Sequence, residues 1–375
     1  MSTVAAPRTR RTGLCPTFTT PSVQRDGLLM RIPLVGGRLG LEQVDAIADV
    51  AERHGNGVIE LTNRGNLQLR GVTHEGLEAA VAGLAATGLG DEMARIVTVS
   101  PFAGPGERSL RAVVVAALAA IDLSRLSGKF VVHVDDGSHT ADGADMVISI
   151  ALNRTTAAFV DLGRVRYELP LADLPAVVQS VVALCVEHGA DARWKDVSTE
   201  LPHPSQRRPA ASESRWAPVG IITTSGVHVV AGMPLGRTNP IQLRDVAKAC
   251  ATNGSNGLSI SPWRSIVVEC ASVTAASGLV DGLEAAGLVT TADHPAHGVI
   301  TCIGRAGCWQ TELDTLLVAA EVIADRAAFG SLGETVHVSG CAKSCACHDA
   351  VAVTLLGRDD SSGFDIVRSA DRCRS

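Results

Sequence analysis

An internal repeat constrains the fold of this chain more than any other feature of its sequence. Residues 41–64 match residues 241–264 at a constant offset of 200, from L-E-Q-V-D opposite I-Q-L-R-D to an arginine at the end of both copies. Each copy begins with an apolar strand containing a Pro-Leu pair, followed by a helix, two short strands and a second helix, at 75–84 and about 275–285. This is the element order of a ferredoxin-like unit. We therefore expect two such units related by a pseudo-twofold axis.

The two arginines that end the copies, Arg64 and Arg264, are candidate binding residues. The repeat predicts that they occupy equivalent places facing a shared groove. Most arginines in hairpins are only solvated, but Arg64 lies in a turn of small and polar residues, where its planar group could bind a carboxylate through two hydrogen bonds. Arg95 and Lys129 fit the same role.

The rest of the chain predicts two α/β modules, so the fold class is α+β: two ferredoxin-like half-domains in a pseudo-twofold repeat plus these modules. We expect helices over 108–121, 171–188 and 310–326, and strands over 129–134, 145–151, 157–160, 299–302, 335–338 and 349–356. The predicted organisation is a mobile tail (1–20), half-domain 1 (21–90), the first α/β module (91–197), a linker rich in Pro, Ser and Arg (198–214), half-domain 2 (215–290), a cluster-binding α/β module (291–357) and a C-terminal tail (358–375).

Four cysteines near the C-terminus form a C-x5-C pair, Cys302 and Cys308, and a C-x3-C pair, Cys341 and Cys345. A five-residue spacing fits zinc poorly, whereas a [4Fe-4S] cluster needs four thiolates that converge from two loops. Buried free thiols are the alternative, since cysteine is common in protein cores. The paired spacing favours the cluster, with all four cysteines as ligands.

These motifs resemble the siroheme-dependent sulfite and nitrite reductase superfamily. The cysteine loops TCIGRAGC and HVSGCAKSC resemble its cluster signature, and residues 59–71, 93–104 and 126–137 resemble its two arginine segments and its lysine segment. The resemblance spans about residues 15–356, and HVSGCAKSCA with SPWRSIVV most resembles the precorrin-3B synthase family. It implies that Arg64, Arg95 and Lys129 are catalytic and substrate-binding residues, with Arg264 as a further substrate-binding residue.

For that member of the superfamily, the resemblance implies oxygen-dependent hydroxylation of precorrin-3A with lactone formation to give precorrin-3B, in aerobic cobalamin biosynthesis. The partners would be the tetrapyrrole, molecular oxygen and a separate electron-donor protein, with a mononuclear non-haem iron as a further candidate cofactor. The alternative is a siroheme-dependent sulfite or nitrite reductase, with siroheme as cofactor. Against it, Val131 stands where the reductases typically have a second lysine, and Gly65 where they commonly have glutamine.

Composition supports a cytoplasmic enzyme that binds neither membranes nor nucleic acids. The formal net charge is −6, 3% of residues are aromatic, and no apolar run reaches the length of a membrane span. An anionic substrate must therefore be held by a local cluster of cations. Cys347 and His348 are candidate ligands of a second iron but are more typical of packing. Neither Cys15 nor any other histidine is singled out by its spacing.

Overall fold

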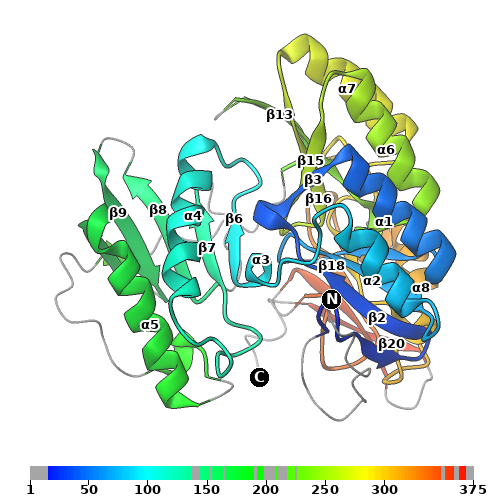
Figure 1. Cartoon of the computed structure of the whole chain (residues 1–375). Helices are drawn as coiled ribbons and strands as arrows, with labels where there is room; N and C mark the ends of the chain where they lie inside the picture. The colour runs from blue at the N-terminus through cyan, green and yellow to red at the C-terminus, as the bar shows by residue number, and fades with distance from the viewer. Residues whose placement is uncertain are drawn as a thin grey trace.

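The computed structural model describes residues 16–136, 144–151, 154–163, 165–189, 192–197, 208–209, 218–223, 226–347, 351–358 and 363–368. The chain forms two parts in Figure 1: the first α/β module on the left, and on the right the two repeats with the cysteine-bearing module. Cys15, His139 and His348 lie outside the described residues, as does most of the predicted linker. The predicted domain boundaries stay predictions.

The first repeat contains the predicted order of strand, helix, strand, strand and helix. Helix α1 buries Val44, Ile47 and Ala51 on one face and ends where Gly55 follows it. The Pro-Leu pair, expected within a strand, comes directly after β2. The elements are β1 (Ser22–Gln24), β2 (Gly27–Ile32), η1 (Val35–Gly37), β3 (Arg38–Gly40), α1 (Leu41–His54), β4 (Ile59–Leu61), β5 (Leu67–Val72) and α2 (Leu77–Ala85).

The second repeat has the same elements in the same order. Helix α6 begins at Pro240, a favourable first residue because proline has no N–H to leave unpaired at a helix start. The side chain of Asn239 caps the helix by accepting a hydrogen bond from the Gln242 N–H at 3.0 Å. The elements are β12 (Gly220–Ile222), β13 (Val227–Gly232), η4 (Pro234–Gly236), β14 (Arg237–Thr238), α6 (Pro240–Thr252), β15 (Gly257–Ile260), β16 (Ser265–Cys270) and α7 (Val273–Ala285).

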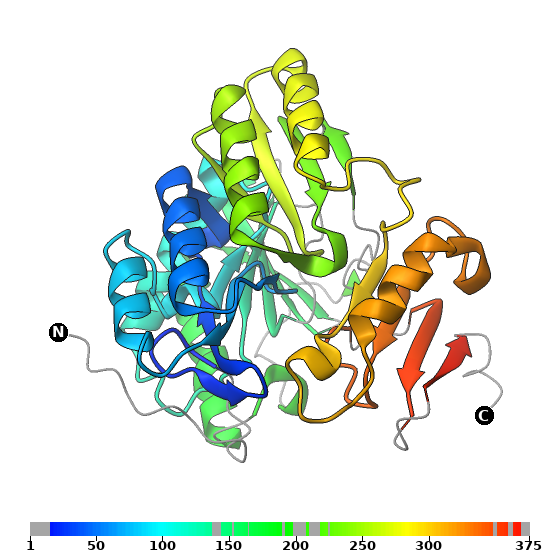
Figure 2. The same cartoon turned by 90° about the vertical axis from the view of Figure 1, so that its right-hand side faces the viewer.

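The two repeats exchange one edge strand each. Strand β14 of the second repeat pairs with β4 of the first, which gives the sheet order β1-β2-β5-β4-β14. Strand β3 of the first repeat pairs with β15 of the second, which gives the order β12-β13-β16-β15-β3. Helix α1 packs on α6, and Figure 2 shows them side by side. One cluster of buried apolar side chains runs through both repeats, so they share a core.

The first α/β module is a six-stranded sheet in the order β11-β10-β9-β8-β7-β6. Strand β10 was not predicted, and β7 begins three residues later than expected. The elements are α3 (Met93–Ile96), β6 (Val97–Val99), α4 (Pro105–Ala119), β7 (Val132–Asp135), β8 (Met146–Ala151), β9 (Arg154–Leu162), β10 (Val165–Pro170), η2 (Leu171–Asp173), α5 (Leu174–His188), η3 (Trp194–Asp196) and β11 (Arg208–Pro209).

One helical stretch of this module, Leu171–His188, is long and apolar enough to cross a membrane by length and composition. Its residues Val178, Val181 and Val182 are buried against the six-stranded sheet and α4. The apolar side of this helix therefore has a partner within the module.

The cysteine-bearing module holds a four-stranded sheet in the order β17-β18-β19-β20. Residues 364–368, expected to belong to a tail, form its edge strand, and Phe18 of the predicted N-terminal tail is 3% exposed. The helix expected from 310 begins at 315, because the Asp314 side chain caps it by accepting the Leu317 N–H at 3.0 Å. The elements are β17 (Val299–Thr301), η5 (Gly304–Ala306), α8 (Thr315–Ala324), α9 (Arg326–Phe329), β18 (Val336–Ser339), β19 (Val353–Gly357) and β20 (Phe364–Arg368).

Candidate functional site

The cysteine loops follow the ends of two neighbouring parallel strands. Cys302 comes directly after β17, and Cys341 comes two residues after β18. The Gly340 N–H donates to the Cys302 sulfur at 3.3 Å, and the Gln310 N–H donates to the Cys308 sulfur at 3.4 Å. Amide donors of this kind stabilise the negative charge of a cluster thiolate.

All four predicted ligands lie in one region. Burial raises the pKa of Cys345, and the nearby thiols of Cys341, Cys302 and Cys308 raise it further, while Lys343 acts in the opposite direction. Within the described part of the chain, no three His, Cys, Asp or Glu side chains form a group that could hold a single metal ion, whereas the four thiolates of a [4Fe-4S] cubane each bind a different iron and lie farther apart. The donor set, four thiols on two adjacent loops with amides directed at two of the sulfurs, fits a [4Fe-4S] cluster.

Arg64, Arg95 and Lys129 meet at one turn. The Arg64 guanidinium donates to the carbonyl of Lys129 at 3.2 Å, and that of Arg95 donates to the carbonyl of Gly128 at 2.7 Å. Arg95 also lies 3.5 Å from a carboxylate oxygen of Glu92. Lys129 itself is exposed, so two arginines hold the backbone of the turn that presents it.

A shallow cleft, open to solvent, lies between this turn region and both hairpins. Arg64 lines it, and so does Val131, which is 5% exposed. The other lining residues are Gly37, Asn63, Gly65, Thr98, Val99, His133, Ala144, Ile260 and Pro262. Both repeats line this cleft, as expected of the predicted groove, but Arg264 does not line it, and Arg95 and Lys129 stand beside its lining.

The structure separates Arg264 from the other three candidates. Its guanidinium donates to the carbonyl of Ala346 in the second cysteine loop. The expected equivalence with Arg64 is wrong by one residue: the N–H groups of Gly65 and Arg264 close matching turns, and both residues have left-handed backbones, with φ of 62° and 59°. Trp263 is the counterpart of Arg64. The glycine is needed at its position, because a Cβ there would lie 2.8 Å from the Ile260 carbonyl oxygen.

His133 lines the cleft on β7, a role that spacing alone did not reveal. It is 3% exposed, and its Nδ1 lies 2.9 Å from the hydroxyl of Thr98. Burial lowers the pKa of His133 to about 4, although the carboxylates of Asp135 and Asp136 act in the opposite direction. At neutral pH the ring is therefore uncharged.

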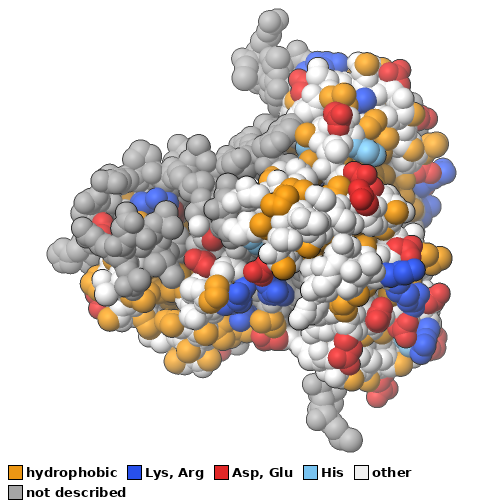
Figure 3. All heavy atoms as spheres, turned by 90° about the horizontal axis from the view of Figure 1, so that it is seen from above, with side chains coloured by type: hydrophobic (Ala, Val, Ile, Leu, Met, Phe, Trp, Pro, Cys, Tyr) orange, Lys and Arg blue, Asp and Glu red, His pale blue; other side chains and the backbone are white. Residues whose placement is uncertain are grey.

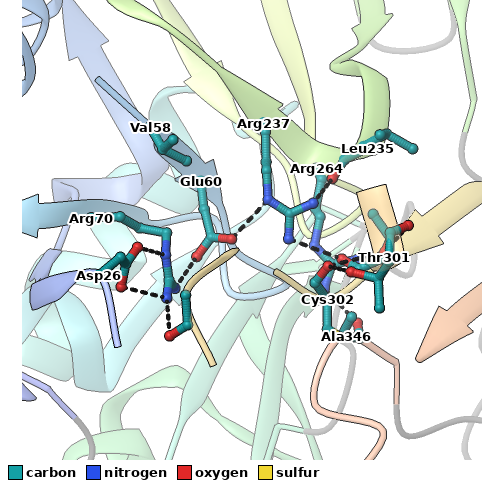
Figure 4. Close-up of polar contacts among 12 residues, drawn as sticks. Asp26, Val58, Glu60, Arg70, Leu235, Arg237, Arg264, Thr301, Cys302 and Ala346 are labelled. Carbon is teal, nitrogen blue, oxygen red and sulfur yellow. Dashed lines mark hydrogen bonds and ion pairs between the residues drawn. The ribbon is translucent and has the colours of Figure 1, made fainter. Parts of the chain in front are cut away.

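A second set of residues missed in the sequence is the ion-pair network in Figure 4. Arg70 donates to both Asp26 and Glu60, and Glu60 also accepts from Arg237. Glu60 and Arg70 belong to strands, where a charged residue at a buried position is a signal that could have identified them. The network lies between the first repeat and the first cysteine loop.

Basic and acidic side chains are interspersed on the part of the surface visible in Figure 3. An anionic ligand would therefore depend on local cations such as Arg64 and Lys129.

Comparisons with known proteins agree with this architecture. Residues 22–87 match the model of the nitrite/sulfite reductase ferredoxin-like half domain. The NirA protein of Mycobacterium tuberculosis, whose structure is solved, superposes with a TM-score of 0.67 and 18% identity over 90% of this chain and 73% of that one. The chain has the nitrite/sulfite reductase fold. It also resembles a precorrin-3B synthase from Sinorhizobium sp, with 29% identity over 400 residues, 95% of this chain and 83% of the relative.

Both of these relatives align with most of the molecule, over 95% and 90% of this chain. At this coverage the similarity extends into both repeats and both modules. The predicted α+β class, with ferredoxin-like half-domains and modules of the sulfite and nitrite reductase type, is confirmed.

Proposed function

We propose that this protein hydroxylates precorrin-3A with molecular oxygen and forms the lactone of precorrin-3B, a step of aerobic cobalamin biosynthesis in the cytoplasm. The observation that carries this proposal is the 29% identity to a precorrin-3B synthase over 95% of the chain. One oxygen atom enters the substrate, and the other leaves as water with two electrons and two protons from a donor protein.

The cations beside the cleft suit such a substrate. Tetrapyrrole precursors carry acetate and propionate carboxylates around the ring, and these need several fixed cations. Arg64 lies in the cleft wall, while Arg95 and the exposed Lys129 share the adjoining turn. Each guanidinium can hold a carboxylate through charge-assisted hydrogen bonds. Arg264, which contacts the second cysteine loop, has a positioning role in this proposal.

Val131 supports oxygenation over anion reduction. Its buried apolar side chain forms part of the cleft wall, where it excludes water and carries no proton. Sulfite or nitrite reduction consumes several protons, and a lysine at this position could deliver them. The matched half domain and the shared fold keep a siroheme-dependent reductase as the second candidate.

Cys302, Cys308, Cys341 and Cys345 would hold the [4Fe-4S] cluster. When bound, the cluster would supply electrons one at a time. Oxygen activation needs a further centre, and a mononuclear non-haem iron is the candidate. Neutral His133, whose Nδ1 lies 2.9 Å from the Thr98 hydroxyl, adds an uncharged polar group to the cleft wall.

Mass spectrometry of the product tests the proposal. Protein purified without oxygen and supplied with an electron donor should consume oxygen only with precorrin-3A, and the product should be heavier by one oxygen atom. Its visible spectrum should show a broad cluster shoulder without chlorin bands. Sulfite and nitrite reduction, assayed in parallel with siroheme supplied, should be weak. Robust anion reduction with no oxygenated tetrapyrrole would replace this proposal with the reductase.

A further inference from the structure

Three arginines hold the two cysteine loops by their backbone carbonyls. Arg70 donates to the Gly307 carbonyl at 3.1 Å, and Arg237 donates to the Thr301 carbonyl at 3.2 Å. Arg264 donates to the Ala346 carbonyl in the second loop. Each of these carbonyls belongs to a residue adjacent to a predicted ligand: Cys308, Cys302 and Cys345.

Glu60 joins the two arginines that hold the first loop. One of its carboxylate oxygens lies 3.0 Å from Arg70, and the other lies 2.9 Å from Arg237. The exchanged strand makes this possible, because Arg237 of β14 pairs directly with Glu60 of β4. One carboxylate therefore connects the two ends of the loop, and Figure 4 shows the chain of contacts.

The network is buried and its charges balance. The side chains of Arg70 and Glu60 are 4% and 14% exposed, and Asp26, at 2.8 Å from Arg70, supplies the second carboxylate. Burial would raise the pKa of Glu60, but the charges of Arg237 and Arg70 outweigh it and lower that pKa. Glu60 is thus ionised, and two negative groups balance two positive ones.

The first loop is fitted closely to this network. A Cβ on Gly307 would lie 2.3 Å from the Arg70 guanidinium and 2.8 Å from the Asp26 carboxylate. Only a residue without a side chain allows the guanidinium to reach the loop at this point. The contact between Arg70 and the loop is therefore built into the sequence of the loop.

We propose that Glu60 is a positioning residue that, through Arg70 and Arg237, fixes both ends of the Cys302–Cys308 loop and so sets the retention of the cluster, while its negative charge beside that loop sets the reduction potential. This inference rests on the proposed [4Fe-4S] cluster. Glu60 is also the carboxylate that both loop-holding arginines contact, so its loss leaves net positive charge beside the loop. Positive charge favours the reduced, more negative state of a cluster.

The test compares two variants prepared without oxygen. Glu60→Gln removes the charge and loosens both arginines. Arg237→Lys keeps the charge but lacks the planar group needed to contact Glu60 and Thr301 together. Iron and acid-labile sulfide per chain, the midpoint potential from an EPR titration, and the rate of iron loss to a chelator are measured for both. The control is Asp161→Asn, whose carboxylate, 13% exposed, pairs with Arg166 in the six-stranded sheet.

We expect Glu60→Gln to raise the midpoint potential and to lose iron about tenfold faster, as follows from loosening a charge-assisted contact of about 1.4 kcal/mol. Arg237→Lys should lose iron faster at an unchanged potential, which keeps the inference testable if Glu60→Gln folds poorly. Asp161→Asn should match the wild type. Wild-type potential and iron loss in both network variants would overturn the inference, whereas wild-type protein without iron and sulfide would overturn the proposed cluster itself.

Discussion

Burial determines the charge of His133, and this makes stability depend on pH. The pKa of His133 falls from 6.5 to about 4 on folding, since desolvation outweighs Asp135 and Asp136. The unfolded chain therefore binds a proton that the folded chain excludes between these values. The contribution to stability is complete above about pH 6.5 and is lost as the pH falls to about 4.

We expect this histidine to account for up to about 3 kcal/mol of the acid destabilisation. Urea unfolding of the wild type and of His133→Asn, measured from pH 7.5 to 4.5, gives the difference. The free energy of unfolding should fall more steeply for the wild type, so parallel curves would contradict the lowered pKa.

Burial also distinguishes the core cysteines from the predicted ligands. Cys185 and Cys250 are at most 1% exposed in apolar cores, and burial raises the pKa of each to about 12. Such thiols stay protonated and bind metal poorly. Cys308, by contrast, is half-buried and accepts an amide N–H.

Replacement of Cys308 by serine should therefore remove most iron and acid-labile sulfide. Cys185→Ser and Cys250→Ser should retain both, and they serve as controls for the loss of one thiol. Full retention of iron and sulfide in Cys308→Ser would remove this residue from the ligand set.

At the scale of elements, the hairpin that carries Arg64 connects the cleft to the cysteine loop. Strand β4 contributes Glu60 to the network, and the turn after it contributes Arg64 to the cleft wall. We expect Arg64→Ala and Arg95→Ala to weaken tetrapyrrole binding while cluster content stays unchanged. Each lost charge-assisted contact is worth about 1.5–3 kcal/mol, or roughly ten- to a hundredfold in affinity.

Equilibrium binding of the tetrapyrrole, followed by its absorbance, measures this effect. Arg53→Ala is the matched control, because this arginine belongs to the same repeat but is 70% exposed on α1. Wild-type affinity in both cleft variants would place the substrate elsewhere.

The elements themselves were largely predictable, because apolar periodicity is local. Helix α1 and its stop at Gly55 follow from such a pattern. The start of α8 was not found, since the cap at Asp314 lies inside a segment that also reads as helical. The exact counterpart of Arg64 was also missed, because the repeats correspond at an offset of 199 in the structure, from the helix N-caps Gly40 and Asn239 to the hairpin turns, and not at the 200 taken from the sequence.

The site residues were predictable only where they stand at a characteristic spacing in the sequence. The cysteine pairs and the arginine segments carry motifs. The contacts of Arg70 with Gly307 and of Arg237 with Glu60 join residues separated by 237 and 177 positions, and no local pattern encodes them. The exchange of β3 and β14 is equally non-local, because each strand pairs with the other repeat. With at most three residues, each strand is also too short to show a pattern of its own.

That exchange determines how the whole molecule should behave when it is divided. Each repeat lacks an edge strand without the other, α1 packs on α6, and one core runs through both. Exposed edges and a half-covered core favour aggregation over independent folding. We therefore expect residues 215–375 alone to aggregate, whereas fragments 1–214 and 215–375 expressed together should copurify as one complex.

The complex should unfold in a single transition, because a core shared by two fragments is lost as a unit. Affinity purification through a tag on one fragment, followed by thermal unfolding monitored by circular dichroism, tests this. Disruption of the α1–α6 contact supplies the control: Ile47→Asp, at a fully buried position of α1, should abolish copurification, whereas Arg53→Ala on the exposed face should not. A folded, monomeric 215–375 fragment with its own sharp transition would show that the second half of the chain is independent and that the exchanged strands contribute little to its stability.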